Sequence, residues 1–410
     1  MTSPDRAEDL IYDWNTVGDD WRPTEKILLD DETLRDGLQS PSVTDPPLQT
    51  KIRLVHLMDE LAIDTADVGL PGAGPRAVED VTEICRAIVA SKLAIRPNCA
   101  ARTHADDIQP IVRCAQAAGI PIEACLFIGS SPIRLYTEDW KIDTLLGWTE
   151  KAVTHAVKEG LPVMFVTEDT TRANPEHLKR LYTVAIECGA SRVCVSDTVG
   201  HATPEGVAHL LAHVREIIAG TGRSVGIDWH GHKDRGLSVA NCLAAIRAGA
   251  TRVHGAGIGI GERAGNAPME LILVNLHLLG WSRRALGRLA EYCETVSRAC
   301  GVPIPRNYPV VGADAFETAT GVHAAAVIKA FRKGDRTLAD RVYSSVPAGE
   351  LGMEQKIRVG PMSGRSNVIY WLEKRGIEPT EGRVDAIYKA AKSSPRLLED
   401  EEMHALIDRT

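Results

Sequence analysis

The segment PVMFVTEDTTRANPEHLKRLYTVAIECGASRVCVSD, residues 162–197, carries one complete strand–helix–strand pattern. PVMFVTE at 162–168 and SRVCVSD at 191–197 are short runs rich in β-branched residues, which is typical of buried strands. Between them, Asn174 and Pro175 begin a segment with helical periodicity, because Asn caps a helix and Pro suits its first turn. The segment therefore predicts two parallel strands joined by a helix.

The same unit repeats along the chain. Six further strand-like runs are KILLD at 26–30, TADVG at 65–69, LAIRPN at 93–98, PIEACLFIG at 121–129, SVGIDWH at 224–230 and TRVHGAG at 251–257. Nearly all of them precede a longer segment with helical periodicity. Eight such units, with no strand runs left over, predict an α/β fold, the closed (β/α)8 TIM barrel, and favour it over an open doubly wound sheet.

The repeat ends near residue 285, and the sequence beyond it is mainly helical after a linker-like stretch that contains Pro303, Pro305 and Pro309. We therefore predict an N-terminal arm at 1–25, the barrel at 26–285 and a helical accessory region at 286–410.

Composition excludes several classes of partner. No run approaches the roughly 20 apolar residues that cross a bilayer, and the acidic, polar start does not resemble a secretory signal. The net charge of −8 gives no general attraction to nucleic acid. Nine cysteines are scattered singly, without a CxxC pair, as expected for reduced packing thiols. We predict a cytoplasmic protein with a small-molecule partner, and no nucleic acid or membrane.

Polar motifs follow the first and seventh predicted strands, where barrels build their active sites. They are DETLRDGLQ at 31–39 and HGHKD at 230–234. Residues i and i+2 of an extended segment point the same way, so His230 and His232 can reach one ion, with Asp36 as the carboxylate. Such a set leaves positions open for substrate, as a catalytic divalent metal requires. The alternative is that both histidines are ordinary core or surface residues.

A glycine-rich loop, GAGIGIGERAGN at 255–266, follows the eighth strand and can bring backbone close to a ligand. It lacks the Lys-Ser/Thr of a P-loop and does not open a first βα unit as a dinucleotide fingerprint does. Phosphate-transfer and hydride-transfer functions are therefore disfavoured.

Three motifs together resemble one known family. DETLRDGLQ at 31–39, HGHKDRGLSVANCLAAIRAGA at 230–250 and GIGERAGNAPMELIL at 259–273 are similar to the DRE-TIM metallolyases, which include 2-isopropylmalate, homocitrate and citramalate synthases and hydroxymethylglutaryl-CoA lyase. Shorter similarities extend the resemblance over about residues 26–330. It implies a biosynthetic acyltransferase that joins acetyl-CoA to a 2-oxo acid by Claisen-type condensation and releases CoA.

The resemblance also implies residue roles. Asp36, His230 and His232 would bind the metal, Asn266 would complete or support the shell, and Arg35 would stabilise the developing oxyanion. Zn, Mn, Co and Mg all remain open as the metal.

Four further positions would contact substrate or act in catalysis. Thr198 matches a residue that hydrogen-bonds the substrate carboxylate, and Glu168 matches an acidic site residue; both could instead be caps. Asn98 and Arg102, after the third strand, are candidate substrate contacts.

Deprotonating the acetyl methyl group of a thioester needs a base held close to it. His323, in TGVHAAA, is our candidate. The resemblance implies that this segment reaches into the mouth of a barrel, either its own or that of a partner subunit. A homodimer is expected on the same ground. The alternative is a structural helix histidine.

Two departures from the family pattern affect the choice of reaction and substrate. Leu38 stands where the synthases carry Glu and the lyases Leu, but the cysteine-bearing loop of the lyases is missing from GERAGNA. We therefore favour condensation over a lyase or aldolase, and both over a catalytically silent scaffold. Arg134, after SSPI, could receive a second anionic group, which would suit oxaloacetate, 2-oxoglutarate or phosphonopyruvate; an exposed salt bridge is the alternative.

Overall fold

The computed structural model describes residues 10–19 and 21–408. The chain divides into two compact units, Arg22–Pro303 and a second unit that comprises Met1–Trp21 and Ile304–Thr410. The first unit holds every barrel strand.

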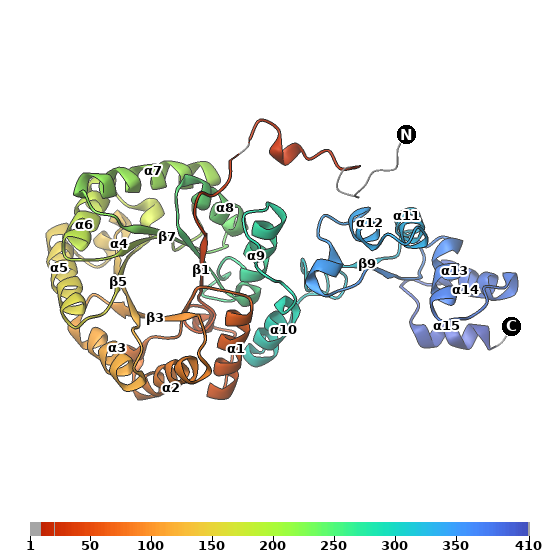
Figure 1. Ribbon diagram of the computed structural model, residues 1–410, viewed down its shortest axis with the longest axis horizontal. Coiled ribbons are helices and arrows are strands. Elements are labelled where there is room, and N and C mark those ends of the chain that lie inside the picture. The colour runs from red at the N-terminus through yellow and green to blue at the C-terminus, as the bar shows by residue number, and fades with distance from the viewer. Residues whose placement is uncertain (1–9, 20, 409–410) are drawn as a thin grey trace. The chain divides into compact units, whose positions relative to one another are not determined.

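Eight parallel strands form the closed barrel that the sequence predicts, in the order of the chain. They are β1 (Leu28–Asp31), β2 (Thr65–Asp67), β3 (Arg96–Arg102), β4 (Glu123–Gly129), β5 (Val163–Glu168), β6 (Arg192–Asp197), β7 (Gly226–Gly231) and β8 (Arg252–Gly255). β1 pairs with β8 and closes the ring. Figure 1 looks along the barrel, with the strands as an inner ring and the helices outside it.

The helices of this unit are α1 (Leu48–Glu60), α2 (Pro75–Ser91), α3 (Ala105–Ala118), α4 (Pro132–Thr137), α5 (Ile142–Lys158), α6 (Pro175–Glu187), α7 (Pro204–Thr221), α8 (Ser238–Ala248), α9 (Met269–Leu278) and α10 (Leu289–Cys300). The predicted helix start at Asn174 is confirmed, because its side chain accepts hydrogen bonds from the backbone N–H groups of Glu176 and His177. α10 packs against α1, and the unit continues to Pro303. The predicted boundary near residue 285, between the barrel and the accessory region, stays a prediction.

One strand lies later than its pattern suggests. β3 covers Arg96–Arg102, whereas the run that predicted it, LAIRPN, occupies residues 93–98. Its segment RPNCAAR has few β-branched residues, but its backbone pairs with β2 and β4. Pairing with both neighbours therefore determines this strand more than its own residue preferences do.

Ion pairs fill the barrel near the N-terminal ends of the strands. Arg252, at 1% exposure, donates to the carboxylates of Asp228 and Glu123. Asp30 lies in the same interior and accepts from Thr65 and from Asn98. We call Asp30, Glu123, Asp228 and Arg252 the charged floor. It occupies the barrel interior below the C-terminal ends of the strands.

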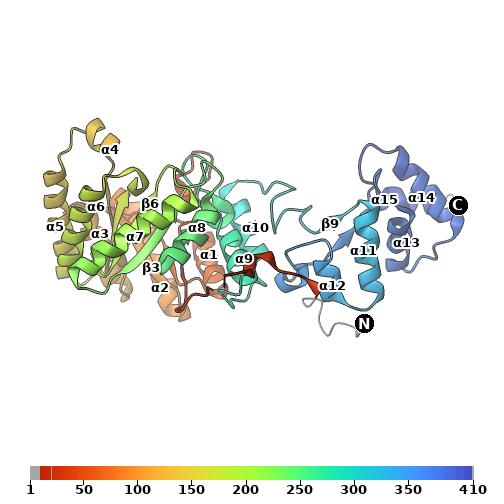
Figure 2. The same ribbon diagram turned by 90° about the horizontal axis from the view of Figure 1, so that it is seen from above.

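The second unit is mainly helical. It contains α11 (Gly321–Arg332), α12 (Arg336–Arg341), α13 (Arg365–Lys374), α14 (Glu381–Ser393), α15 (Asp400–Ile407) and a parallel pair of short strands, β9 (Glu317–Thr318) and β10 (Lys356–Ile357). Figure 2 shows α13, α14 and α15 grouped together, and Val368, Leu372, Val384 and Ile387 lie in their common core. Over the described residues, none of the helices combines the length and the apolar character that crossing a bilayer requires.

Candidate active site

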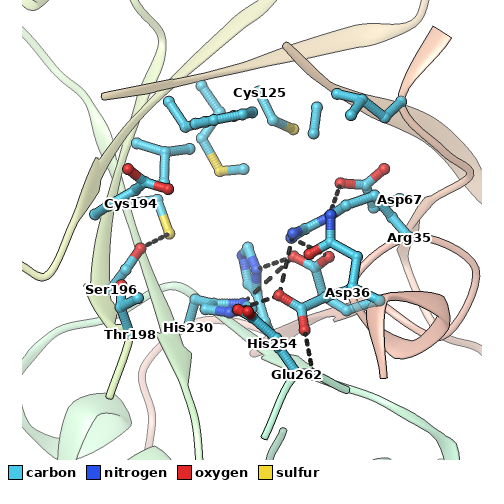
Figure 3. Close-up of a pocket in the computed structure, with 18 of the residues that line it drawn as sticks. Arg35, Asp36, Asp67, Cys125, Cys194, Ser196, Thr198, His230, His254 and Glu262 are labelled. Carbon is cyan, nitrogen blue, oxygen red and sulfur yellow. Dashed lines mark hydrogen bonds and ion pairs between the residues drawn. The ribbon is translucent and has the colours of Figure 1, made fainter. Parts of the chain in front are cut away.

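A cavity of about 190 Å³ opens at the C-terminal ends of the barrel strands. Its lining comes from all eight strands or the loops that follow them, and it includes five carboxylates, three histidines and Arg35. Figure 3 shows these side chains converging on one space. The position is the one that barrel enzymes use for catalysis.

Asp36, His230 and His232 come together as the sequence predicts. The Nε2 atoms of both histidines lie 3.6 Å from Oδ2 of Asp36 and 3.3 Å from each other. A four-coordinate ion with ligand distances of about 2.1 Å holds its ligand atoms about 3.4 Å apart. Two imidazoles and one carboxylate at this spacing therefore fit a divalent metal.

Asn266 contributes to the same cluster. Its side-chain N–H donates to Oδ1 of Asp36 at 2.8 Å, while its Oδ1 is buried and has no hydrogen-bond partner among the described residues. A buried carbonyl oxygen without a partner is costly, and a cation would remove that cost. Gly261 lies against both residues at φ +146°, and a Cβ there would come 2.9 Å from the Asp36 carboxylate. The glycine-rich loop thus allows the close approach that places Asn266.

The protonation states suit metal binding. Burial opposes the charge of Asp36, but Arg35 and the two histidines hold the pKa of its carboxyl well below the usual range. Burial also lowers the pKa of His230. An ionised carboxylate beside a neutral imidazole is the form in which these side chains bind metals.

Arg35 is fixed by three carboxylates. Its Nε donates to Asp67 at 3.0 Å, and its two terminal nitrogens donate to Asp36 at 3.1 Å and to Glu32. A guanidinium has five N–H groups, so two remain for a substrate oxygen. Its predicted position beside the metal ligands is confirmed, and its role stays a prediction.

Sequence analysis missed Glu32 and His254. Glu32 Oε1 accepts from Nδ1 of His254 at 2.9 Å and lies 3.4 Å from Nδ1 of His230, so it can orient that ligand. His254 Nε2 also donates to Asp228. Although burial opposes its charge, Asp30, Asp228 and Glu32 together raise the pKa of His254 to about 10. Glu32, His230 and His254 form a second group whose potential ligand atoms lie within 4.8 Å of one another.

Thr198 and Glu168 both line the cavity. Thr198 Oγ1 accepts a hydrogen bond from the backbone N–H of Asp169 at 2.8 Å, which leaves its hydroxyl proton available. Burial raises the pKa of Glu168 at the end of β5. Both residues therefore lie where a ligand of the cavity would meet them.

Three of the predicted substrate contacts do not line this cavity. Asn98 is fully buried one layer deeper and donates to Asp30 of the charged floor. The Arg102 side chain is 70% exposed and bonds both oxygens of Asp107. Arg134 lies on α4, where it pairs with Glu138 at 3.1 Å. Their predicted contact with substrate stays a prediction.

Arg134 and Arg102 line a separate cavity with Trp140 and Trp148, and this cavity shares Phe127 and Glu168 with the first. His323 belongs to the second unit, on α11, where it is exposed and its ring stacks on Tyr343 with 4.2 Å between centroids. Its role as base stays a prediction.

Several known proteins are similar to this chain. The family described as HMGL-like matches residues 26–296. The chain is 34% identical to the homocitrate synthase AksA of Methanopyrus kandleri, over 90% of this chain and 88% of that protein. It is 32% identical to the 2-isopropylmalate synthase of Nitratidesulfovibrio vulgaris, over 93% and 73% respectively. Among solved structures, the HMG-CoA lyase of Bacillus subtilis matches with a TM-score of 0.59 at 20% identity, over 70% of this chain and 97% of that one, and it supports the barrel fold alone.

Proposed function

Because the chain belongs to the HMGL-like family, we propose that it is an acyltransferase that condenses acetyl-CoA with a 2-oxo acid and releases CoA, as the names of its synthase relatives suggest. The observation that carries the proposal is the convergence of Asp36, His230 and His232 beside the unpartnered oxygen of Asn266. These four residues would hold one divalent metal, of which Zn, Mn, Co and Mg are all candidates.

The oxo acid would lie with its carbonyl and carboxylate oxygens toward the three ligands. A divalent cation held there would polarise the carbonyl as a Lewis acid. Arg35, held rigid by three carboxylates, would direct its two remaining N–H groups at the oxygen that becomes negative. Thr198 would donate its hydroxyl proton to the substrate carboxylate.

The acetyl methyl group of acetyl-CoA loses a proton, and the carbon attacks the oxo carbon, whose C=O π electrons move onto oxygen. That alkoxide takes up a proton to give a tertiary alcohol. Water then cleaves the thioester, and CoA leaves as a thiol. His323 stays the predicted acceptor of the methyl proton. Glu168, whose carboxyl pKa is raised by burial, would exchange a proton with the product oxygen.

Thiol release tests the proposal. The purified protein would be incubated with acetyl-CoA and a panel of 2-oxo acids while free thiol is measured. We expect thiol only when both substrates are present, and none from Asp36→Asn. Asp143→Asn is the matched control, because Asp143 is an exposed carboxylate paired with Arg180 on the outer helices. Thiol release that does not depend on any oxo acid would contradict condensation, and cleavage of hydroxymethylglutaryl-CoA would favour the lyase. The homodimer and the cytoplasmic location stay predictions.

A further inference from the structure

One side of the catalytic cavity is apolar and rich in sulfur. Cys125 of β4, Met164 and Val166 of β5 and Cys194 of β6 line it and pack together. We call these four residues the sulfur-rich wall. Figure 3 shows Cys194 across the cavity from Asp36, so the wall faces the metal ligands.

The wall carries no charge. Burial raises the pKa of both Cys125 and Cys194 above the usual range, so both thiols stay protonated. The Cys194 Sγ lies 3.8 Å from the Ser196 hydroxyl, and the Cys125 Sγ lies 3.9 Å from a backbone carbonyl of its own strand. Neutral thiols of this kind behave as small hydrophobic groups.

The cations that line the cavity are already engaged. Arg35 contacts three carboxylates, and its two remaining N–H groups serve the oxygen that becomes negative in the proposed condensation. Both ring nitrogens of His254 face carboxylates. Glu168 adds a further carboxyl group beside the wall. A second carboxylate on the oxo acid would therefore lose its hydration without gaining a counter-charge, which is strongly unfavourable.

Arg134 does not supply that counter-charge. It lines the neighbouring cavity, which shares Phe127 and Glu168 with the first, and its charge is already paired. It forms an ion pair with Glu138, lies 5.5 Å from the Trp140 ring centroid, and acts to lower the pKa of the Glu168 carboxyl, which burial raises. The structure therefore does not meet the condition under which the sequence favoured a dicarboxylic or phosphonate substrate.

We propose that the sulfur-rich wall receives the side chain of the 2-oxo acid, so that the enzyme accepts compact, uncharged side chains and rejects oxo acids with a second anionic group. The inference rests on the proposed condensation, and it selects among the substrates that the different synthase relatives use.

The substrate panel tests it directly. We expect kcat/KM for pyruvate, 2-oxobutyrate or 2-oxoisovalerate to exceed that for oxaloacetate, 2-oxoglutarate and phosphonopyruvate by at least ~100-fold. Preference for any of the three dianionic substrates overturns the inference and leaves the condensation standing. If none of the oxo acids supports thiol release, the proposed function is overturned, and the inference with it.

Two variants locate the selectivity. Val166→Leu adds one methylene to the wall and should lower kcat/KM for 2-oxoisovalerate relative to pyruvate by about 10-fold or more, with metal content unchanged. Val157→Leu, at a half-exposed position on α5, is the matched control. Arg134→Gln should leave the ratio of oxaloacetate to 2-oxobutyrate turnover unchanged. An unaltered ratio in Val166→Leu, or a selective loss of oxaloacetate turnover in Arg134→Gln, overturns the assignment.

Discussion

Replacing Glu32 by Gln tests whether this residue positions the metal ligand His230. In the structure Glu32 accepts from Nδ1 of His254 at 2.9 Å and from Arg35, and it lies 3.4 Å from Nδ1 of His230. All three neighbours are hydrogen-bond donors at the atoms that face it. A glutamine offers one oxygen and one NH2 group, so at least one donor would meet another donor.

The size of the effect follows from these contacts. Loss of a group that orients a metal-bound histidine typically weakens metal binding 10–100-fold, which equals about 1.4–2.7 kcal/mol. The metal-free variant should also lose stability, because Glu32 faces the part-buried cation Arg35 and the buried His254. We expect a loss of about 3 kcal/mol, the low end for a broken buried pair, since Asp36 and Asp67 still face Arg35 and Asp228 still faces His254.

The assay is a metal titration of chelator-treated protein, followed by competition with a chromophoric chelator. Glu60→Gln is the matched control, because Glu60 is also a carboxylate paired with a guanidinium, that of Arg288, but lies on the surface of α1. Metal dissociation constants that agree within two-fold between Glu32→Gln and the unaltered protein would refute the positioning role, provided that the variant melts cooperatively.

Three more outcomes are expected. Asn266→Ala should weaken metal binding about 10-fold or more, since it removes the unpartnered oxygen and the donor to Asp36. Asn275→Ala is the control and should not weaken it, because the Asn275 side-chain amide donates to a carbonyl of its own helix. Equal metal affinities in the two variants would argue against Asn266 as a ligand. Chelation should abolish thiol release, and metal at 100 times its dissociation constant should restore it and add about 2.7 kcal/mol to the unfolding free energy; full activity after verified metal removal would contradict the site. Burial raises the pKa of Asp31 from 3.8 to about 7, so the folded state binds an extra proton between about pH 4 and 7, and this group's contribution to stability is lost as pH rises through that window. Asp31→Asn should reduce the stability difference between pH 5 and pH 8 by about 2.7 kcal/mol at most, measured by urea unfolding; an unchanged difference between the two pH values would show that Asp31 is not its source.

The convergence of the three candidate metal ligands could be predicted from the sequence because their geometry is local. His230 and His232 stand two apart on one strand, and an extended backbone fixes their common direction. Asp36 follows the first strand, and barrel closure alone brings the ends of β1 and β7 to one rim. Periodicity likewise identified all eight strands, and it failed in detail only for β3, whose pairing is not encoded in its own residues.

Glu32 and His254 could not be found in this way. They are 222 residues apart, and they meet because β1 pairs with β8 in a register that sets Asp30 beside His254. Asn98 shows a second limit. Alternation along a strand tells which side chains point into a barrel, but it does not give their depth, so Asn98 was expected at the rim and lies in the interior beside Asp30.

The charged floor has an evolutionary consequence. Removing the Arg252 side chain alone would leave the part-buried Glu123 without this guanidinium and the buried Asp228 with only Arg192 and His254, and a buried charge that loses a partner is far more harmful than the loss of the whole pair. Selection should remove single replacements at the positions of the charged floor, whereas joint replacements by apolar residues of similar volume are tolerable. Among descendants of a common ancestor, these positions should thus be inherited or exchanged as a set, while the residues of the cavity above them diverge one at a time.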